Sequence, residues 1–331
     1  MAEVLTTIWE RLFERSSIGA EENFFDLGGN PSLAIQLFLE IAKISGRELP
    51  PLTIYQAPTI SALASFLQEP ERVRFTPLVL LKAGSEKPPI YLAHGLGGSV
   101  MELFPLAKHL AAGHPVYGLQ ARGIDGVSTP FKTIEEKAQA YLHAIKQVQP
   151  KGPYFFVGYS LGGLVMLEIA QRLSAQGERV GLLAMVDSYP HASRLSPPQR
   201  ALLAVRVARG RLLTARRLTM QMLGLAPNEP ASIDLYRPPH HASFAPTMKL
   251  VRDGAYSALR RYKPSFYHGG INFIRAEVST TFPDDPVPVW AHLAAKFHVE
   301  TVPGDHLRML TTHFETLASV LNRFLRCVPC Q

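Results

Sequence analysis

A serine between two glycines carries the strongest chemical signal in the sequence. It stands in the motif Gly-Tyr-Ser-Leu-Gly at residues 158–162, after the apolar run 154–157 and before a helical pattern over 164–176. This strand–turn–helix setting suits a sharp turn that exposes the central hydroxyl, because larger side chains beside it would collide. The N–H groups at the start of the helix would favour negative charge that develops there. The pattern therefore predicts that Ser160 is a nucleophile.

A serine hydroxyl needs a base to remove its proton, and the base needs an acid to orient it. His306 follows the last expected strand, and its loop would present it over the serine at the carboxyl edge of a parallel sheet. Asp187 ends the strand after the motif, whereas Asp284 and Asp285 follow the next strand, so the topology allows either position for the acid. Asp305 adjoins the histidine and is expected to fix its own loop. The order serine, Asp187, His306 matches nucleophile, acid and base in hydrolases.

A glycine-rich loop, His-Gly-Leu-Gly-Gly at residues 94–98, follows the first expected strand of this region. A dinucleotide-binding loop would need a third glycine where Val100 stands, so that interpretation fails. The loop could instead turn the N–H of Leu96 toward the same oxyanion as the N–H of Leu161. The alternative is a tight turn without a catalytic role.

Short apolar runs alternate with helical patterns from residue 90 onward, which indicates a parallel sheet covered on both faces. The expected strands are 90–93, 116–119, 154–157, 182–186, 271–275 and 299–302. The expected helices are 99–110, 134–147, 164–176, 291–295 and 310–326. Residues 191–250 break this rhythm and look like an insertion, which contains Arg200, Arg206, Arg209, Arg211, Arg216 and Arg217.

The first 70 residues have a different texture. Apolar periodicity predicts helices over 4–15, 33–44 and 60–67, and Gly46 is expected to end the second. The proline-rich stretch 49–59 is expected to be irregular, and residues 69–88 are expected to form a linker. This is a small all-α bundle near the lower size limit for independent folding.

The two parts differ in charge. Residues 1–70 hold nine acidic and four basic residues, which is −5, and the remainder of the +7 chain is +12. Electrostatic attraction between the parts is the interpretation we favour, because the sequence has no zinc-finger spacing, aromatic RNA-binding signature or helix-turn-helix pattern. The basic insertion could equally be a solvated helix face.

The composition points to a globular protein without a disulfide framework. Hydrophobic residues make up 47% of the 331 residues. The only cysteines are Cys327 and Cys330, and we interpret the segment that contains them as a frayed C-terminal tail rather than a metal site. We find no signal peptide and no apolar stretch long enough to span a membrane, so we expect a soluble, cytoplasmic protein.

The segments YLAHGLGG, PVYGLQARG, GPYFFVGYSLGGLVMLEIAQ, LLAMVDSYP and VPGDH resemble the type I thioesterase domains that end nonribosomal peptide and polyketide assembly lines. The resemblance covers about 75–327 and implies an α/β-hydrolase fold with a mobile helical lid. In that family the acid follows the strand after the motif, which favours Asp187. Residues 3–68, with NFFDLGGNPSLAIQLF, resemble the acyl or peptidyl carrier domains that precede such thioesterases.

One residue departs from the carrier pattern. The family pattern predicts a phosphopantetheine-bearing serine at position 31, but this chain has Pro31, with Ser32 one residue later. A proline suits the first turn of a helix. A shift of one residue turns the side-chain direction by about 100° if the helical register is kept. The resemblance implies covalent 4'-phosphopantetheine on Ser32, and the alternative is that Ser32 only caps the helix.

We therefore expect a carrier at 1–70, a linker at 71–88, and a thioesterase at 89–328 with a lid at about 191–250. The expected activity transfers an acyl or peptidyl chain from a phosphopantetheine thioester to Ser160 and releases it by hydrolysis or cyclisation. Implied partners are upstream synthetase modules or an adenylation domain, and a phosphopantetheinyl transferase. The alternatives are a stand-alone serine hydrolase or acyltransferase with a degenerate carrier, and a non-catalytic docking module.

Overall fold

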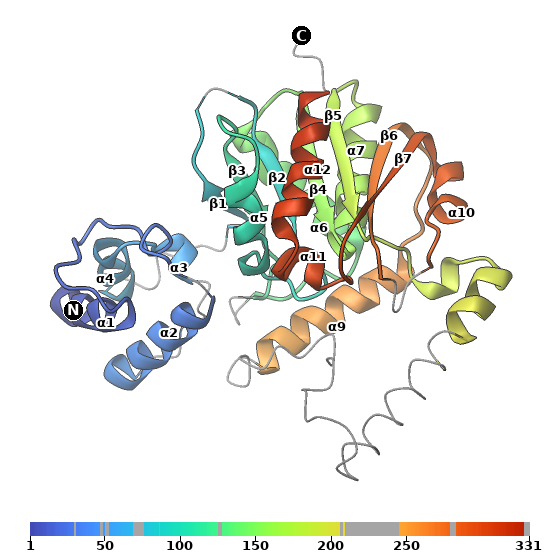
Figure 1. Ribbon diagram of the computed structural model, residues 1–331. Coiled ribbons are helices and arrows are strands. Elements are labelled where there is room, and N and C mark those ends of the chain that lie inside the picture. Colours follow the sequence, from blue (N-terminus) through green and yellow to red (C-terminus); the bar gives the residue numbers. More distant parts are fainter. Residues whose placement is uncertain are drawn as a thin grey trace.

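The chain forms a small helical region followed by a larger region built on a β-sheet (Figure 1). The computed structural model describes residues 1–29, 31–46, 49, 53–68, 76–85, 87–124, 128–205, 208, 245–278 and 283–327. Of the arginines expected in the insertion, Arg200 lies in the described helical residues 197–205, and the other five lie outside the described residues.

In the described residues, the N-terminal region contains four helices: α1 (Ala2–Leu12), α2 (Pro31–Ser45), α3 (Thr53–Gln56) and α4 (Ile60–Gln68). Trp9 and Phe24 are buried in its core, and with the partly buried Phe13 they pack edge to face, with ring centroids 5.2–5.9 Å apart. Gly46 has φ +68°, which is the left-handed conformation expected at the end of α2. The expected all-α bundle is therefore confirmed.

The larger region is organised on a seven-stranded sheet with the order β1-β3-β2-β4-β5-β6-β7. The strands are β1 (Leu78–Lys82), β2 (Ile90–Ala93), β3 (Val116–Leu119), β4 (Tyr154–Tyr159), β5 (Val180–Val186), β6 (Tyr267–Ala276) and β7 (Ala294–Val302). Only the pairing of β1 with β3 is antiparallel, and the other five pairings in this sheet are parallel. Every residue of β2 and β4 is buried, as continuous apolar runs predict for strands covered on both faces.

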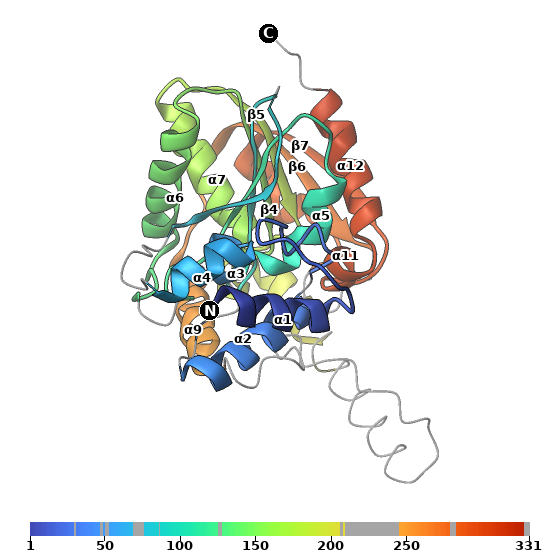
Figure 2. The same ribbon diagram turned by 90° about the vertical axis from the view of Figure 1, so that its left-hand side faces the viewer.

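Helices cover both faces of the sheet. They are α5 (Phe104–His109), α6 (Ile134–Val148), α7 (Leu161–Ala175), α9 (Ala245–Arg261), α10 (Val287–Trp290), α11 (Arg308–Thr311) and α12 (Phe314–Arg326), with short 3-10 turns η2 (Met101–Leu103), η3 (Ala192–Arg194) and η5 (Ala291–Leu293). Figure 2 shows α6 and α7 on one face and α5, α11 and α12 on the other. Helix α12 is strongly amphipathic because one of its sides is buried against the protein and the other faces solvent.

Three sequence-based expectations are wrong. The expected linker contains the edge strand β1, whose short run of alternating burial is a weak periodic signal. The proline-rich stretch contains the short helix α3. The helix expected at 291–295 is the turn η5, after which β7 begins at Ala294, because pairing with β6 overrides the local preference.

The carboxyl ends of the parallel strands meet at one edge of the sheet. The residues that follow β2, β4, β5 and β7 there are the ones singled out for chemistry: the loop 94–98, Ser160, Asp187 and, four residues after β7, His306. Helix α9 lies over part of this edge, where Val251 packs with Ala121 and Ile124. The topology therefore assembles the candidate site from segments far apart in the sequence.

Candidate active site

Ser160 stands in a strained turn between β4 and α7. Its φ is 54° and its ψ is −122°, which L-residues rarely adopt. The motif glycines make the turn possible: a Cβ on Gly158 would lie 2.4 Å from the Gly162 backbone, and a Cβ on Gly162 would lie 2.4 Å from the Ala93 oxygen. The Ser160 N–H donates to the Val186 carbonyl at 2.8 Å. The turn thus has the form that the sequence motif predicts.

His306 pairs with Asp187. Its Nδ1 lies 2.7 Å from Oδ2 of Asp187, and both side chains are buried. The other carboxylate oxygen accepts the N–H of Ala276 at 3.3 Å. An aspartate on Nδ1 fixes the ring so that Nε2 points the other way, which is the arrangement a general base requires.

Tyr159 holds the histidine beside the turn. Its ring stacks on the His306 ring with centroids 4.7 Å apart, and its hydroxyl donates to the His306 carbonyl at 2.7 Å. Because Tyr159 immediately precedes Ser160, these contacts bring the His306–Asp187 pair next to the serine. No role for Tyr159 is predicted from the sequence, because its place between the two glycines of the motif gives no signal for one.

The residues 94–98, here called the oxyanion loop, lie against the serine. A Cβ on Gly95 would be 3.3 Å from the Ser160 Cβ, so this glycine permits the close approach. Within the described residues, the N–H groups of Leu96 and Leu161 donate no hydrogen bond. Two unused donors at such a site can stabilise an oxyanion.

Buried polar groups support the oxyanion loop. Nε2 of His94 lies 3.0 Å from the Tyr141 hydroxyl, which donates to the Gln120 carbonyl at 2.9 Å. Burial, followed by the nearby Lys137 charge, lowers the pKa of His94 to about 3, so this histidine is neutral and unsuited to be the base. Burial also lowers the pKa of Lys137, on α6, to about 8.

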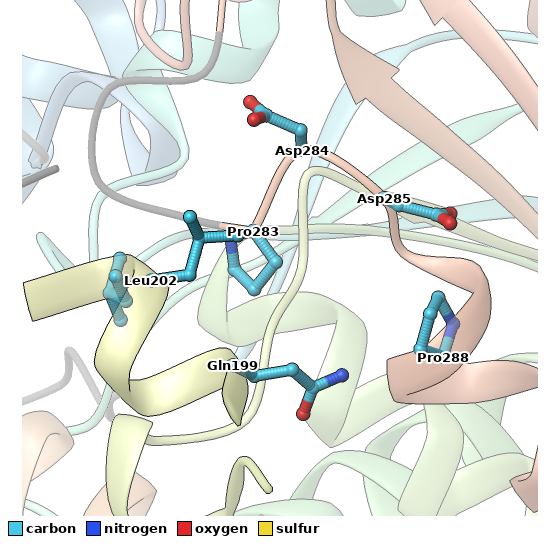
Figure 3. Close-up of a pocket in the computed structure, with 7 residues that line it drawn as sticks. Gln199, Leu202, Pro283, Asp284, Asp285 and Pro288 are labelled. Atoms are coloured by element: carbon cyan, nitrogen blue, oxygen red, sulfur yellow. The ribbon is translucent and has the colours of Figure 1, made fainter. Parts of the chain in front are cut away.

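The alternative acids lie on the segment between β6 and α10. The Asp284 carbonyl accepts a hydrogen bond from Arg275 at 2.6 Å, and the Asp285 carboxylate accepts the N–H of Val287 at 2.9 Å. Both line a pocket of about 180 Å³ beside the helical residues 197–205 (Figure 3), together with Gln199, Leu202, Leu203, Pro283 and Pro288. The carboxylate that meets the His306 ring is that of Asp187.

Asp305 has the local role expected of it. Its carboxylate accepts the N–H groups of Leu307 and Arg308 at 3.1 Å and 2.9 Å. These bonds fix the turn between β7 and α11, which carries His306.

The helical region contacts the larger region close to the candidate site. Phe25, in the loop before α2, packs on Phe104 of α5 with ring centroids 4.6 Å apart. Nζ of Lys108 donates to the Phe25 carbonyl at 3.2 Å and lies 4.8 Å from the centroid of the Phe104 ring. Helix α5 follows η2 and the oxyanion loop directly. The loop before α2 is therefore anchored on the chain segment that leads out of the site.

Ser32 belongs to the first turn of α2, and its side chain lies outside the described residues. The preceding turn is well defined: Gly28 has φ +96°, and a Cβ on Gly29 would lie 2.3 Å from the Phe24 oxygen. A serine in the first turn of a helix suits a phosphodiester, because the helix N-terminus favours negative charge. The backbone thus fits a phosphate-linked group there.

The part of the chain that the structure describes contains no cluster of three or more histidine, cysteine, aspartate or glutamate residues that could hold a metal. Cys327 is an exposed free thiol after α12, and Cys330 lies outside the described residues. None of the described helices is long and apolar enough to cross a membrane.

A family model for the thioesterase domain matches residues 88–325. The chain belongs to this family. A second family model, for the phosphopantetheine attachment site, matches residues 3–67 and indicates a covalently attached 4'-phosphopantetheine. Thioesterases of this kind have the α/β-hydrolase fold, so the expected fold class, an α/β hydrolase after a small carrier bundle, is confirmed.

Among curated relatives, the chain is 33% identical over 299 residues to a dimodular nonribosomal peptide synthase of Bacillus subtilis (strain 168), covering 86% of this chain and 12% of that protein. It is 39% identical over 173 residues to an indigoidine synthase of Dickeya dadantii (strain 3937), covering 52% of this chain and 12% of that protein. The chain thus spans about an eighth of the length of these relatives.

Solved structures show the same fold. A holo four-domain nonribosomal peptide synthetase bound to AMP and glycine matches with a TM-score of 0.61 and 22% identity, covering 99% of this chain and 26% of that one. The type II thioesterase BorB of the borrelidin biosynthetic cluster matches with a TM-score of 0.56 and 20% identity, covering 77% of this chain and all of that one.

Proposed function

We propose that the chain is a carrier–thioesterase pair that takes an acyl or peptidyl thioester, transfers the chain to Ser160 and releases it. The observation that carries the proposal is the His306–Asp187 pair, 2.7 Å apart, which Tyr159 holds beside the strained serine turn. The thioesterase family match supports the reaction class.

In the acylation step, Ser160 Oγ attacks the thioester carbonyl while Nε2 of His306 takes the hydroxyl proton. Asp187 stabilises the imidazolium that forms and keeps the ring in the required tautomer. The N–H groups of Leu96 and Leu161 hold the oxyanion. Collapse of the tetrahedral intermediate breaks the carbon–sulfur bond, and His306 returns the proton to the departing thiolate.

Release repeats the chemistry with a new nucleophile. His306 takes a proton from water, or from a hydroxyl or amine within the acyl chain, and that atom attacks the ester carbonyl. The ester bond to Ser160 breaks, and His306 returns the proton to Oγ. Water gives a free acid, and an internal nucleophile gives a macrocycle.

We propose Ser32 as the residue that holds phosphopantetheine, since it is the serine nearest the family position and stands in the first turn of α2. When bound, this group supplies the thiol that presents the acyl chain as a thioester. Upstream synthetase modules or an adenylation domain would load the chain, and a phosphopantetheinyl transferase would modify Ser32. We propose a carrier at 1–70 and a thioesterase that ends at about 328 and has a lid at about 191–250. Its sheet begins with β1 at Leu78, inside the stretch 71–88 that the sequence predicts as a linker.

A serine-directed fluorophosphonate probe and a soluble acyl thioester test the proposal together. Wild type should be labelled and should cleave the thioester, whereas Ser160→Ala should lose both, and His306→Ala and Asp187→Asn should lose most of each, by about 10³-fold or more. Asp284→Asn and Asp285→Asn are matched controls that should keep most activity. Full activity in Asp187→Asn together with loss in a control would assign the acid to Asp284 or Asp285. A wild type that the probe does not label would favour the docking-module alternative.

A further inference from the structure

Glu102 is a carboxylate beside the candidate site that the proposed reaction does not use. It is the middle residue of η2, which begins two residues beyond the oxyanion loop, and it is exposed while its neighbours Met101 and Leu103 are buried. A Cβ on Gly97 would lie 3.8 Å from its Oε1. Among the described residues, the Glu102 carboxylate has no hydrogen bond or ion pair. Within the part of the chain that the structure describes, no lysine or arginine side chain pairs with this carboxylate.

The surroundings of Glu102 differ from those of an ordinary surface glutamate. Crowding by protein atoms raises the pKa of its carboxyl, and attraction to His306 opposes that effect only in part. The carboxyl group therefore lies within electrostatic reach of the proposed base, His306.

A negative charge at this place opposes one part of the proposed reaction, the build-up of negative charge on the oxyanion. The oxyanion expected at the N–H groups of Leu96 and Leu161 is negative too, and like charges at short range repel. A positive charge on the substrate would remove the conflict. Aminoacyl and peptidyl chains with a free amino group carry such a charge at neutral pH, whereas plain fatty acyl chains do not.

We propose that Glu102 selects acyl chains that carry a protonated amino group, by forming an ion pair with that group beside the oxyanion loop. The inference rests on the proposed function, since it assigns a substrate class to the same site. The selection acts in two ways, because the charge attracts an ammonium and disfavours a neutral chain at the moment the oxyanion forms.

The test compares two soluble thioesters of one amino acid, both on N-acetylcysteamine, one with a free amine and one acetylated on nitrogen. Wild type should prefer the free amine, and Glu102→Gln should lower the ratio of the two kcat/KM values about tenfold, as expected for a partly desolvated ion pair. Turnover of the acetylated substrate should rise, since the repulsion is gone. An unchanged ratio would overturn the proposal, and so would an equal loss on both substrates, which would indicate that Glu102 positions His306.

Two further measurements separate this inference from the proposed function. Glu3→Gln makes the same charge change on α1 of the carrier region and should leave the ratio as in wild type. Ser160→Ala removes the chemistry, so calorimetric binding of both thioesters to it should show the same preference, lost when Glu102→Gln is added. Preferential binding without turnover in wild type would refute the proposed reaction but not the role of Glu102. Turnover or binding without preference would refute the role of Glu102 alone.

Discussion

The two serines proposed for chemistry stand in contrasting backbone settings. Ser160 has a φ of 54°, its N–H donates to Val186 and its carbonyl accepts the N–H of Gly163 at 3.1 Å. Ser32 lies in the ordinary first turn of α2. The first serine has to attack a carbon atom held at a fixed place, whereas the second has to carry a long flexible arm. A serine that reacts through fixed geometry should not tolerate displacement, whereas one that only anchors an arm should.

Moving the catalytic serine by one residue tests this contrast most severely. In the double variant Ser160→Ala, Leu161→Ser, the hydroxyl would stand on the first residue of α7, one position beyond the strained turn. Thioester cleavage should stay at the level of Ser160→Ala, about 10³-fold or more below wild type. Steady-state rates measure the effect, and far-UV circular dichroism checks the fold. Recovery to a tenth of the wild-type rate would show that cleavage does not depend on the strained turn geometry of Ser160.

The displaced carrier serine should still be modified. Incubation with coenzyme A and a phosphopantetheinyl transferase should add one phosphopantetheine to the native chain and none to Ser32→Ala, as seen by intact-mass spectrometry. Pro31→Ser restores the family position and should give a further or faster modification. Mass gain in Pro31→Ser but not in the native chain would show that this carrier is naturally unloaded.

A buried charge also separates the two regions. Lys137 is 3% exposed in the thioesterase region, while the described core of the carrier region buries no charged side chain. Burial lowers the pKa of Lys137 from 10.5 to about 8, so the unfolded chain binds more protons between these values and stability should rise with pH across that window. Below pH 8 the protonated amine is a penalty of up to about 3 kcal/mol.

Lys137→Met should therefore stabilise the thioesterase region at pH 7 by about 2 kcal/mol, within that upper bound. The gain should shrink above pH 8 and vanish near pH 10.5. Urea unfolding at several pH values measures it, with the exposed Lys132→Met as the control. A gain that is the same at every pH would show that packing, rather than the buried charge, is responsible.

The contact between the regions should have the smallest effect. Lys108→Met removes the hydrogen bond to the Phe25 carbonyl and the contact of the ammonium with the Phe104 ring, and it keeps most of the side chain's bulk. Single-turnover release of a chain loaded on the attached carrier should slow about fivefold. Small soluble thioesters should be cleaved as before, and Lys87→Met, an exposed lysine before β2, should change neither rate. Equal slowing on both substrates would indicate that the substitution disturbs the fold of α5 rather than the contact between the regions.

The sequence predicted most of the fold because its signals are local. Continuous apolar runs at 90–93 and 116–119 coincide with β2 and β3, and the helix expected at 134–147 is α6. The edge strand β1 was not predicted, because one of its faces is exposed and its apolar run is short. The basic face expected on the insertion lies largely outside the described residues and stays a prediction.

The site was predicted in part for the same reason. The serine turn depends on neighbouring residues, so the motif at 158–162 was sufficient to indicate it. Tyr159, Glu102 and Lys137 had no recognisable signal, because their surroundings come from other elements: the turn after β7 for Tyr159 and Glu102, and the buried loop residue His94 for Lys137.

By itself, the sequence determined the two regions, most of the strands and helices along the chain, and the strained serine turn, since each depends mainly on side chains within a few residues of one another. The tertiary structure decided which carboxylate meets the proposed base. Asp187 and His306 are 119 residues apart, and they meet at 2.7 Å because β5, β6 and β7 are neighbours in the sheet. From the chain order alone, Asp284 and Asp285 were equally placed, because strand order in space is set by the packing of the whole sheet.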